Sequence, residues 1–124
     1  MTVNKAYAKY IIEGRSPQDE IVSCLLSELE EATNSTQFEQ VRYTASPRNI
    51  QEILMERGKG ELSLNVIGRT IQVFLDFVGL KEGKDYTKIS GGGCSSRYHL
   101  NLRRGRIIKL KEVVEKSRNN YESL

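Results

Sequence analysis

Groups that could form a metal centre, a disulfide framework or a membrane span are scarce in this sequence. It contains two cysteines and one histidine, spread over the chain, which cannot make a four-ligand metal site alone. Cys24 falls on a predicted buried helix and Cys94 on a predicted exposed tip, so we expect two free thiols. No apolar run is long enough for a membrane helix or a signal sequence. We therefore expect a cytoplasmic protein that uses no metal or other cofactor and does not contact a membrane.

Catalytic arrangements are also scarce. Cys94 and His99 are five residues apart, and this odd spacing directs two side chains to opposite faces of a strand. No carboxylate is placed to orient His99. The glycine-rich stretch at 91–95 lacks the lysine and hydroxyl residue that end a phosphate-binding loop. We expect that the chain is not an enzyme.

The composition is that of one folded domain. Hydrophobic residues make up 38% of the 124 residues and charged residues 28%, as in ordinary globular proteins. This length suffices for a single core but not for two well-packed ones. We interpret the chain as one domain, with an N-terminal helix within 1–15, a core at 16–102 and a basic C-terminal helix within 103–124.

Helix signals recur along the first two thirds of the chain. Ser16-Pro17 and Ser46-Pro47 each combine a capping serine with a proline at the first helical position. Apolar residues follow both at helical spacing. The predicted helices cover 3–13, then 17 to the loop at 33–37, then 47–57, with Ile50, Ile53, Leu54 and Met55 packed inward.

A further helix, predicted at 64–78, has two distinct faces. One side carries Ile67, Ile71, Phe74, Leu75 and Val78, which we expect in the core. Ser63 is placed to cap this helix, and Gly79 to end it in the left-handed conformation. The other side carries a polar stripe of Asn65, Arg69, Gln72 and Asp76.

Two alternating segments follow this helix. Residues 84–90 and 96–102 flank the glycine-rich stretch at 91–95, which suits the tip of a hairpin. In the second segment Tyr98, Leu100 and Leu102 alternate with polar residues, a pattern typical of a strand with one buried face. We expect a short strand at 38–44 to pair with this hairpin.

The order of helix, strand, glycine-rich tip and strand over residues 46–102 resembles a winged helix-turn-helix domain. In that superfamily the helix before the hairpin enters the major groove of DNA, and the hairpin tip, called the wing, touches the flanking backbone. The resemblance implies an α+β fold, mainly helical, with a small antiparallel sheet and further helices at both ends. The linker at 58–62 is longer than the turn of about 3–4 residues in the compact form.

Positive charge gathers in the C-terminal part of the chain. Residues 1–45 hold four basic and seven acidic side chains, a net charge of −3. Because the whole chain carries +3, residues 46–124 carry +6. A basic half of this kind fits an anionic partner such as nucleic acid, although a solvated lysine-rich surface has the same composition.

The candidate DNA contacts divide into two sets. Asn65, Arg69 and Gln72, on the helix at 64–78, have the side chains that pair with adenine and guanine edges in the major groove. Lys88 and Arg97 flank the tip on paired strands and Arg103, Arg104 and Arg106 follow its base, so we expect these five cations to converge on one edge of the hairpin. The predicted contacts to the DNA backbone are Lys59, Lys88, Ser95, Arg97, Arg103, Arg104 and Arg106.

The sequence thus predicts a sequence-selective protein that binds double-stranded DNA, either a small transcriptional regulator or a replication or mobile-element accessory factor. The alternative is a protein-interaction module, an adaptor or inhibitor, on a winged-helix fold, because one fold serves several functions. Binding of double-stranded RNA is a third interpretation. Val3, Tyr7, Tyr10 and Ile11 lie outside the winged core, so the N-terminal helices are a candidate homodimer surface.

Overall fold

A computed structural model describes residues 17–90 and 96–122 of the chain, with side chains for 19–89 and 96–116. The helix predicted at 3–13, with its homodimer contact, lies outside these ranges. So do Cys94 and Ser95 in the glycine-rich stretch. What was predicted for these residues stays a prediction.

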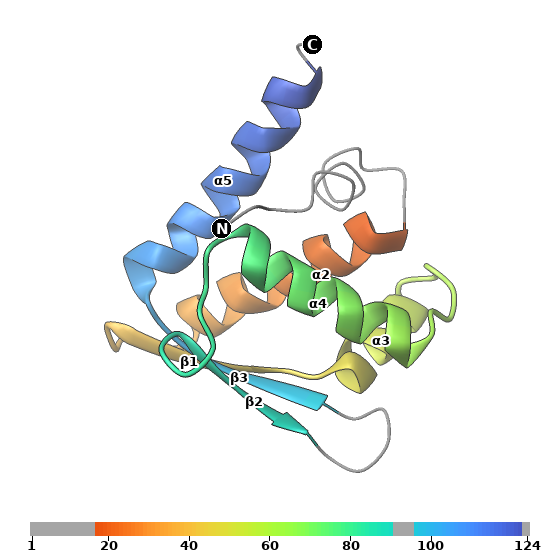
Figure 1. Cartoon of the computed structure of the whole chain (residues 1–124), viewed down its shortest axis with the longest axis horizontal. Coiled ribbons are helices and arrows are strands. Elements are labelled where there is room, and N and C mark those ends of the chain that lie inside the picture. The colour runs from red at the N-terminus through yellow and green to blue at the C-terminus, as the bar shows by residue number, and fades with distance from the viewer. Residues whose placement is uncertain (1–16, 91–95, 123–124) are drawn as a thin grey trace.

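The described residues form an α+β fold, as the sequence predicts. Its elements follow in the order α2 (Pro17–Asn34), β1 (Gln40–Ala45), α3 (Pro47–Glu56), α4 (Leu64–Phe77), β2 (Tyr86–Ser90), β3 (Ser96–Arg103) and α5 (Arg104–Glu122) (Figure 1). The three strands make one antiparallel sheet in the order β1-β3-β2. The expected strand at 38–44 therefore does join the hairpin, and β3 is its central strand.

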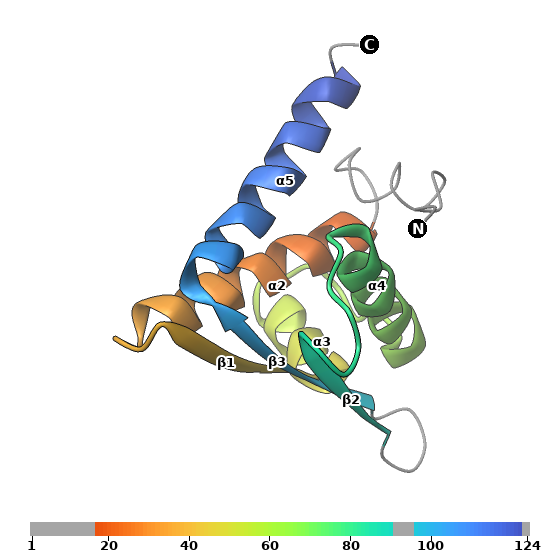
Figure 2. The same ribbon diagram turned by 60° about the vertical axis from the view of Figure 1, so that its left-hand side comes forward.

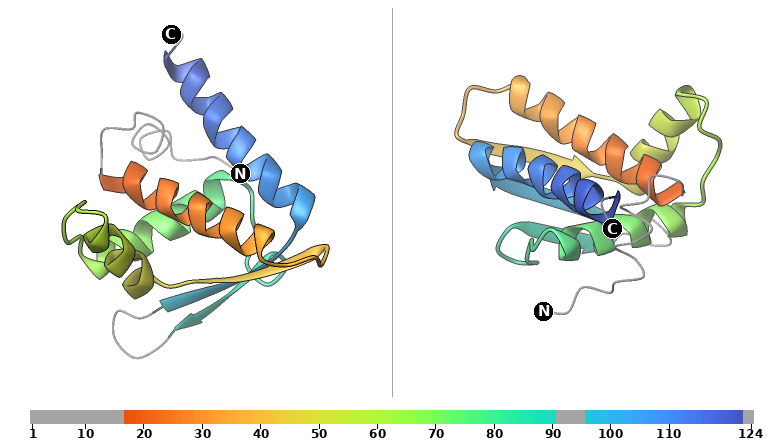
Figure 3. Two further views of the ribbon diagram at one scale, coloured as in Figure 1. Left: turned by 180° about the vertical axis from the view of Figure 1, so that it is seen from behind. Right: turned by 90° about the horizontal axis from the view of Figure 1, so that it is seen from above.

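The helices leave one face of the sheet open. Helices α2, α3 and α4 all lie on the same side of the strands, and no helix of the described chain covers the other side (Figures 1 and 2). The first turns of α5 lie beside α2, and the rest of α5 extends away from the body of the molecule (Figure 3). None of these helices combines the length and apolar content needed to cross a bilayer.

The core fills the space between the helices and the inner face of the sheet. Residues three or four apart share a helix face and alternate residues share a strand face, so the predicted apolar stripes meet there. Tyr98, Leu100 and Leu102 of β3 are each 2% exposed. From the helices, the side chains that are almost fully buried include Ile21, Leu25, Leu29, Ile50, Leu54, Ile67, Ile71, Phe74 and Leu75.

Both predicted ends of α4 are confirmed. The Ser63 hydroxyl accepts a hydrogen bond of 3.2 Å from the backbone N–H of Val66, which would otherwise lack a partner in the first turn. Gly79 follows the helix with φ of 79°, in the left-handed region where a side chain would be strained. These two residues therefore set the length of the helix that carries the polar stripe.

One prediction about packing was wrong. Met55 is 48% exposed, because it follows Leu54 by one residue and so lies about 100° round the helix from the buried side. The last helix begins at Arg104, directly after β3, and it buries Ile107, Leu110 and Val114.

Candidate nucleic-acid interface

The polar stripe of α4 faces solvent beside the hairpin. Asn65 and Arg69 are exposed, and neither side chain forms a hydrogen bond or ion pair within the described part of the chain. Gln72 is half-buried, and its Nε2 donates a hydrogen bond of 3.0 Å to the Tyr86 hydroxyl. Of the three predicted base contacts, Asn65 and Arg69 are free to reach a ligand, whereas the amide nitrogen of Gln72 is engaged inside the fold.

A shallow groove joins this stripe to the base of the hairpin. It has a volume of about 380 Å³, and it is lined by Pro47, Leu64, Asn65, Gly68, Arg69, Gln72, Lys88, Ser96 and Tyr98. The Lys88 ammonium lies 5.8 Å from the centre of the Tyr98 ring, within reach of a cation–π attraction. Burial is the largest cause that raises the pKa of the Tyr98 hydroxyl. The fold thus brings Lys88 to the same groove as the three predicted base contacts.

The hairpin does not gather its cations on one edge, contrary to the prediction. Lys88 is paired with Tyr98 and lies on the helix side of the sheet, whereas Arg97 is paired with Ile89 on the open side. Consecutive residues of a strand point to opposite faces, so this register separates the two cations. Arg103 lies on the open side together with Arg97.

Arg104 has an intramolecular role that its place in a basic cluster does not indicate. Its guanidinium donates to the backbone carbonyls of Thr33 at 2.8 Å, Thr36 at 2.5 Å and Phe38 at 3.0 Å. These carbonyls lie at the end of α2 and in the segment that leads to β1. Carbonyls at a helix end lack partners within the helix, and a cation there is favourable. Arg104 therefore holds α2, β1 and α5 together.

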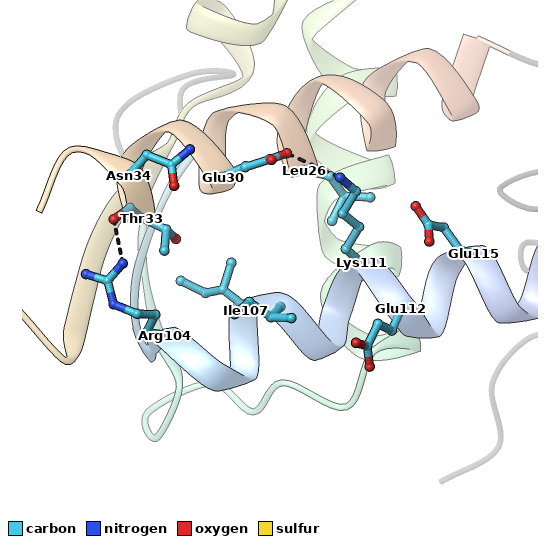
Figure 4. Close-up of a pocket in the computed structure, with 10 residues that line it drawn as sticks. Leu26, Glu30, Thr33, Asn34, Arg104, Ile107, Lys111, Glu112 and Glu115 are labelled. Carbon is cyan, nitrogen blue, oxygen red and sulfur yellow. Dashed lines mark hydrogen bonds and ion pairs between the residues drawn. The ribbon is translucent and has the colours of Figure 1, made fainter. Parts of the chain in front are cut away.

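The same residue closes one end of a hollow between α2 and α5 (Figure 4). Figure 4 shows the bond from Arg104 to Thr33 at that end and the Lys111–Glu30 contact, 3.4 Å long, between the two helices. The hollow has a volume of about 480 Å³, but Glu30, Glu112 and Glu115 line it. These carboxylates would repel phosphate, so this hollow does not suit the predicted partner.

Arg106 is likewise part of the fold. Its Nη1 lies 2.5 Å from Oδ1 of Asp85, a carboxylate that is 6% exposed. The other Asp85 oxygen accepts a hydrogen bond of 2.8 Å from the backbone N–H of Lys81. Burial is the largest influence and by itself would raise the pKa of Asp85. The Lys81 hydrogen bond and the Arg106 guanidinium together outweigh burial, so the pKa lies below its ordinary value.

We expect Asp85→Asn to lower the free energy of unfolding by about 2 kcal/mol at pH 7. This is less than for a fully buried ion pair, because Arg106 is 39% exposed. A folded pKa below the unfolded value contributes stability above about pH 4, which is lost as the pH falls through the folded pKa. Urea titrations at pH 7 and pH 3 should therefore give a smaller difference at pH 3. Glu82→Gln, on an exposed neighbour, is the matched control, and an Asp85→Asn effect that is equal at both pH values would contradict this role.

The remaining predicted backbone contact within the described ranges is Lys59. It follows α3, and its ammonium lies 3.6 Å from a carboxylate oxygen of Glu20 on α2. Both side chains are more than 40% exposed, so the contact is weak and leaves Lys59 accessible. Contact between Lys59 and DNA stays a prediction.

The groups considered for catalysis or metal binding do not assemble within the described residues. Nowhere in these ranges do three His, Cys, Asp or Glu side chains lie close enough together to hold a metal ion. Cys24 is a free thiol at 1% exposure, and burial is the main cause that raises its pKa. His99 lies across the strands from Thr44, with Nδ1 3.0 Å from its Oγ1.

The strongest candidate site is therefore the groove between α4 and the hairpin, with Asn65, Arg69 and Lys88 at its surface. Sequence reasoning predicted all three residues. Sequence reasoning did not single out Arg42, an exposed cation on the open side of the sheet with Arg97 and Arg103. The alternation along the predicted strand at 38–44 could have placed it on the exposed face. No protein-family model, no curated protein sequence and no solved structure matches this chain.

Proposed function

We propose that this protein binds double-stranded DNA with sequence preference, with α4 in the major groove and the hairpin against the neighbouring backbone. The observation that carries the proposal is the groove in which Asn65 and Arg69 of α4 lie beside Lys88 of the hairpin. The order of α3, α4, β2 and β3 is also the order by which the sequence resembles a winged helix-turn-helix. On this proposal the chain is a DNA-binding protein of that kind and not an enzyme.

The two free side chains of α4 have the chemistry to distinguish bases. Arg69 can donate two hydrogen bonds to the O6 and N7 acceptors of guanine, and Asn65 can pair with the N6 and N7 edge of adenine. They are four residues apart, so they occupy one side of the helix, as a helix in a groove requires. Gln72, held by Tyr86, would contribute only its amide oxygen.

The base of the hairpin supplies the positive charge beside this helix. Lys88 is exposed, and Ser96 is half-buried beside it in the groove. An ammonium and a hydroxyl both bind phosphate oxygens, and such contacts position a protein on the duplex without reading its sequence. The charge of +6 over residues 46–124 would favour approach to the same polyanion.

Exposed apolar side chains favour a second candidate function, a protein-interaction module. Phe38 is 76% exposed next to the edge strand β1, and Met55 is 48% exposed on α3. Aromatic residues and methionine are enriched at protein interfaces, so these side chains could contact another protein. They lie outside the groove that contains Asn65 and Arg69.

A gel-retardation assay on random duplex DNA at 50 and 200 mM salt separates the two functions. If the protein neutralises about three phosphates, the logarithm of the binding constant should fall with the logarithm of salt with a slope of roughly −2.7. An apolar protein contact releases no counterions, so it has no such slope. The absence of duplex binding at the lower salt concentration would reject the proposal and favour the protein-interaction module.

A further inference from the structure

The open face of the sheet is an ordered surface with no element over it. Side chains from the three strands alternate between the two faces, and every side chain in the open set is exposed to solvent. Figure 2 shows the helices on the opposite side of these strands. This surface, called the outward sheet face below, consists of Gln40, Arg42, Thr44, Thr87, Ile89, Arg97, His99, Asn101 and Arg103.

Its charge is of one sign. Among the nine side chains there are three arginines and no carboxylate, although acidic residues number 16 in the whole chain. Within the described ranges, the side chains of Arg42, Arg97 and Arg103 form no hydrogen bond or ion pair. Arg104 and Arg106, by contrast, are engaged by carbonyl and carboxylate oxygens. The three outward arginines therefore add nothing to the fold through polar contacts and remain able to bind an anion.

The cations follow the central strand. Arg97 and Arg103 are six residues apart on β3, which corresponds to roughly 20 Å at about 3.4 Å per residue. Arg42 stands between them, because it is paired with Asn101 across from β1. One strand of duplex DNA has a phosphate about every 3.4 Å along the helix axis. The row of arginines thus spans the axial rise of about six base pairs, which is long enough for three separate phosphate contacts on one duplex.

The other side chains of this face indicate which polyanion fits. A protein partner would need buried apolar anchors, and Ile89 is the one large apolar side chain among the nine. Single-stranded nucleic acid needs a series of aromatic rings on which bases stack. The nine include no phenylalanine, tyrosine or tryptophan, and Phe38, which lines a hollow with Gln40 and Arg42, adds one ring at the border of the face. Arginine, asparagine, glutamine and threonine side chains all bind phosphate oxygens. The backbone of a duplex is therefore the occupant that this chemistry favours.

The outward sheet face and the α4 groove lie on opposite sides of the hairpin. Lys88 belongs to the groove and Ile89, the next residue, to the outward face. A straight duplex held against α4 would contact the helix side of β2 and β3 and leave the outward face directed away from it. We propose that the outward sheet face binds the backbone of a second duplex segment without sequence preference, so that one molecule joins two segments. Binding at this face stands on its own residues, whereas the joining of two segments also rests on the proposed function.

Capture of one duplex by another measures the joining directly. An immobilised duplex is saturated with the full-length protein and washed, and a labelled duplex of unrelated sequence is added. The sheet-face variant is Arg42→Gln/Arg97→Gln/Arg103→Gln. It should capture at least roughly tenfold less labelled duplex than the unmodified protein, because it loses three phosphate contacts. The control variant, Arg57→Gln/Lys81→Gln/Lys116→Gln, removes the same charge from exposed positions outside both surfaces and should capture as the unmodified protein does. Thermal melting checks that both variants are folded.

A second measurement separates this inference from the proposed function. In a protein that carries Asn65→Ala and Arg69→Ala, duplex binding at the sheet face should show a salt slope of about −2.7, at about 0.9 for each arginine in contact, and adding the three sheet-face substitutions should remove this binding and its slope. A slope that does not change would overturn binding at this face, whatever α4 does. Capture by the sheet-face variant equal to that of the control would also overturn it, and self-association of the protein would then explain the joining. A different result would contradict the proposed function. The Asn65→Ala/Arg69→Ala protein would then discriminate between DNA sequences as well as the unmodified protein does.

Discussion

Replacing Arg104 by alanine is expected to lower the free energy of unfolding by about 3 kcal/mol. Three backbone carbonyls, of Thr33, Thr36 and Phe38, lose a charged donor at once. A hydrogen bond to a charged group contributes about 1.5–3 kcal/mol, but water can reach the exposed carbonyl end near Phe38 and replace part of the loss. Urea titrations of the variant and of the unmodified protein would measure this difference, provided that both unfold with the same dependence on urea concentration.

Arg103 provides the matched control, because it has the same side chain one residue earlier and this side chain makes no polar contact within the described chain. Arg103→Ala should change stability by less than about 0.5 kcal/mol. Arg104→Lys should fall between the two, since an ammonium cannot reproduce the planar fork that reaches separate carbonyls. Equal destabilisation by Arg103→Ala and Arg104→Ala would contradict the assigned role. Because Arg104 and Arg106 also stabilise the fold, removing them together with Arg103 would not test DNA binding alone.

Changing Asn65 and Arg69 together to alanine is expected to reduce discrimination between the preferred DNA sequence and random duplex by about 2–6 kcal/mol. This corresponds to a roughly 30-fold loss of preference or more. Each side chain can make a paired contact with one base, and neither supports the fold through a polar contact in the described residues. Gln72 is left in place because its side chain donates a hydrogen bond to Tyr86. Replacing it would weaken the fold as well as any contact with DNA.

A preferred site is first selected from random duplexes with the unmodified protein. The Asn65→Ala/Arg69→Ala variant and a control variant are then titrated on that site and on random DNA. Arg57→Ala, which removes an exposed arginine at the end of α3, is the control and should keep the preference. Binding to random DNA should fall much less than binding to the selected site, because phosphate contacts remain. If Asn65→Ala/Arg69→Ala weakens both equally, α4 is not the helix that reads bases.

The sequence by itself determined most elements of the described chain and most of the positions that are buried on them. Ser63 and Gly79 mark the ends of α4, and alternation along β3 identifies Tyr98, Leu100 and Leu102 as core. These features are local, since hydrogen bonding at a cap and spacing along a helix or strand involve residues close together in the chain. Asn65 and Arg69, the two exposed residues of α4 in the groove, were predictable for the same reason.

Only the tertiary structure decided what the cations do. Arg104 reaches Thr33, 71 residues away, and Arg106 reaches Asp85, 21 residues away, so no local pattern distinguishes them from the free Arg103. The register between β2 and β3 places Lys88 and Arg97 on opposite faces of the sheet. A guanidinium takes whichever oxygen the fold brings within reach, and that neighbour is fixed by packing rather than by spacing in the sequence.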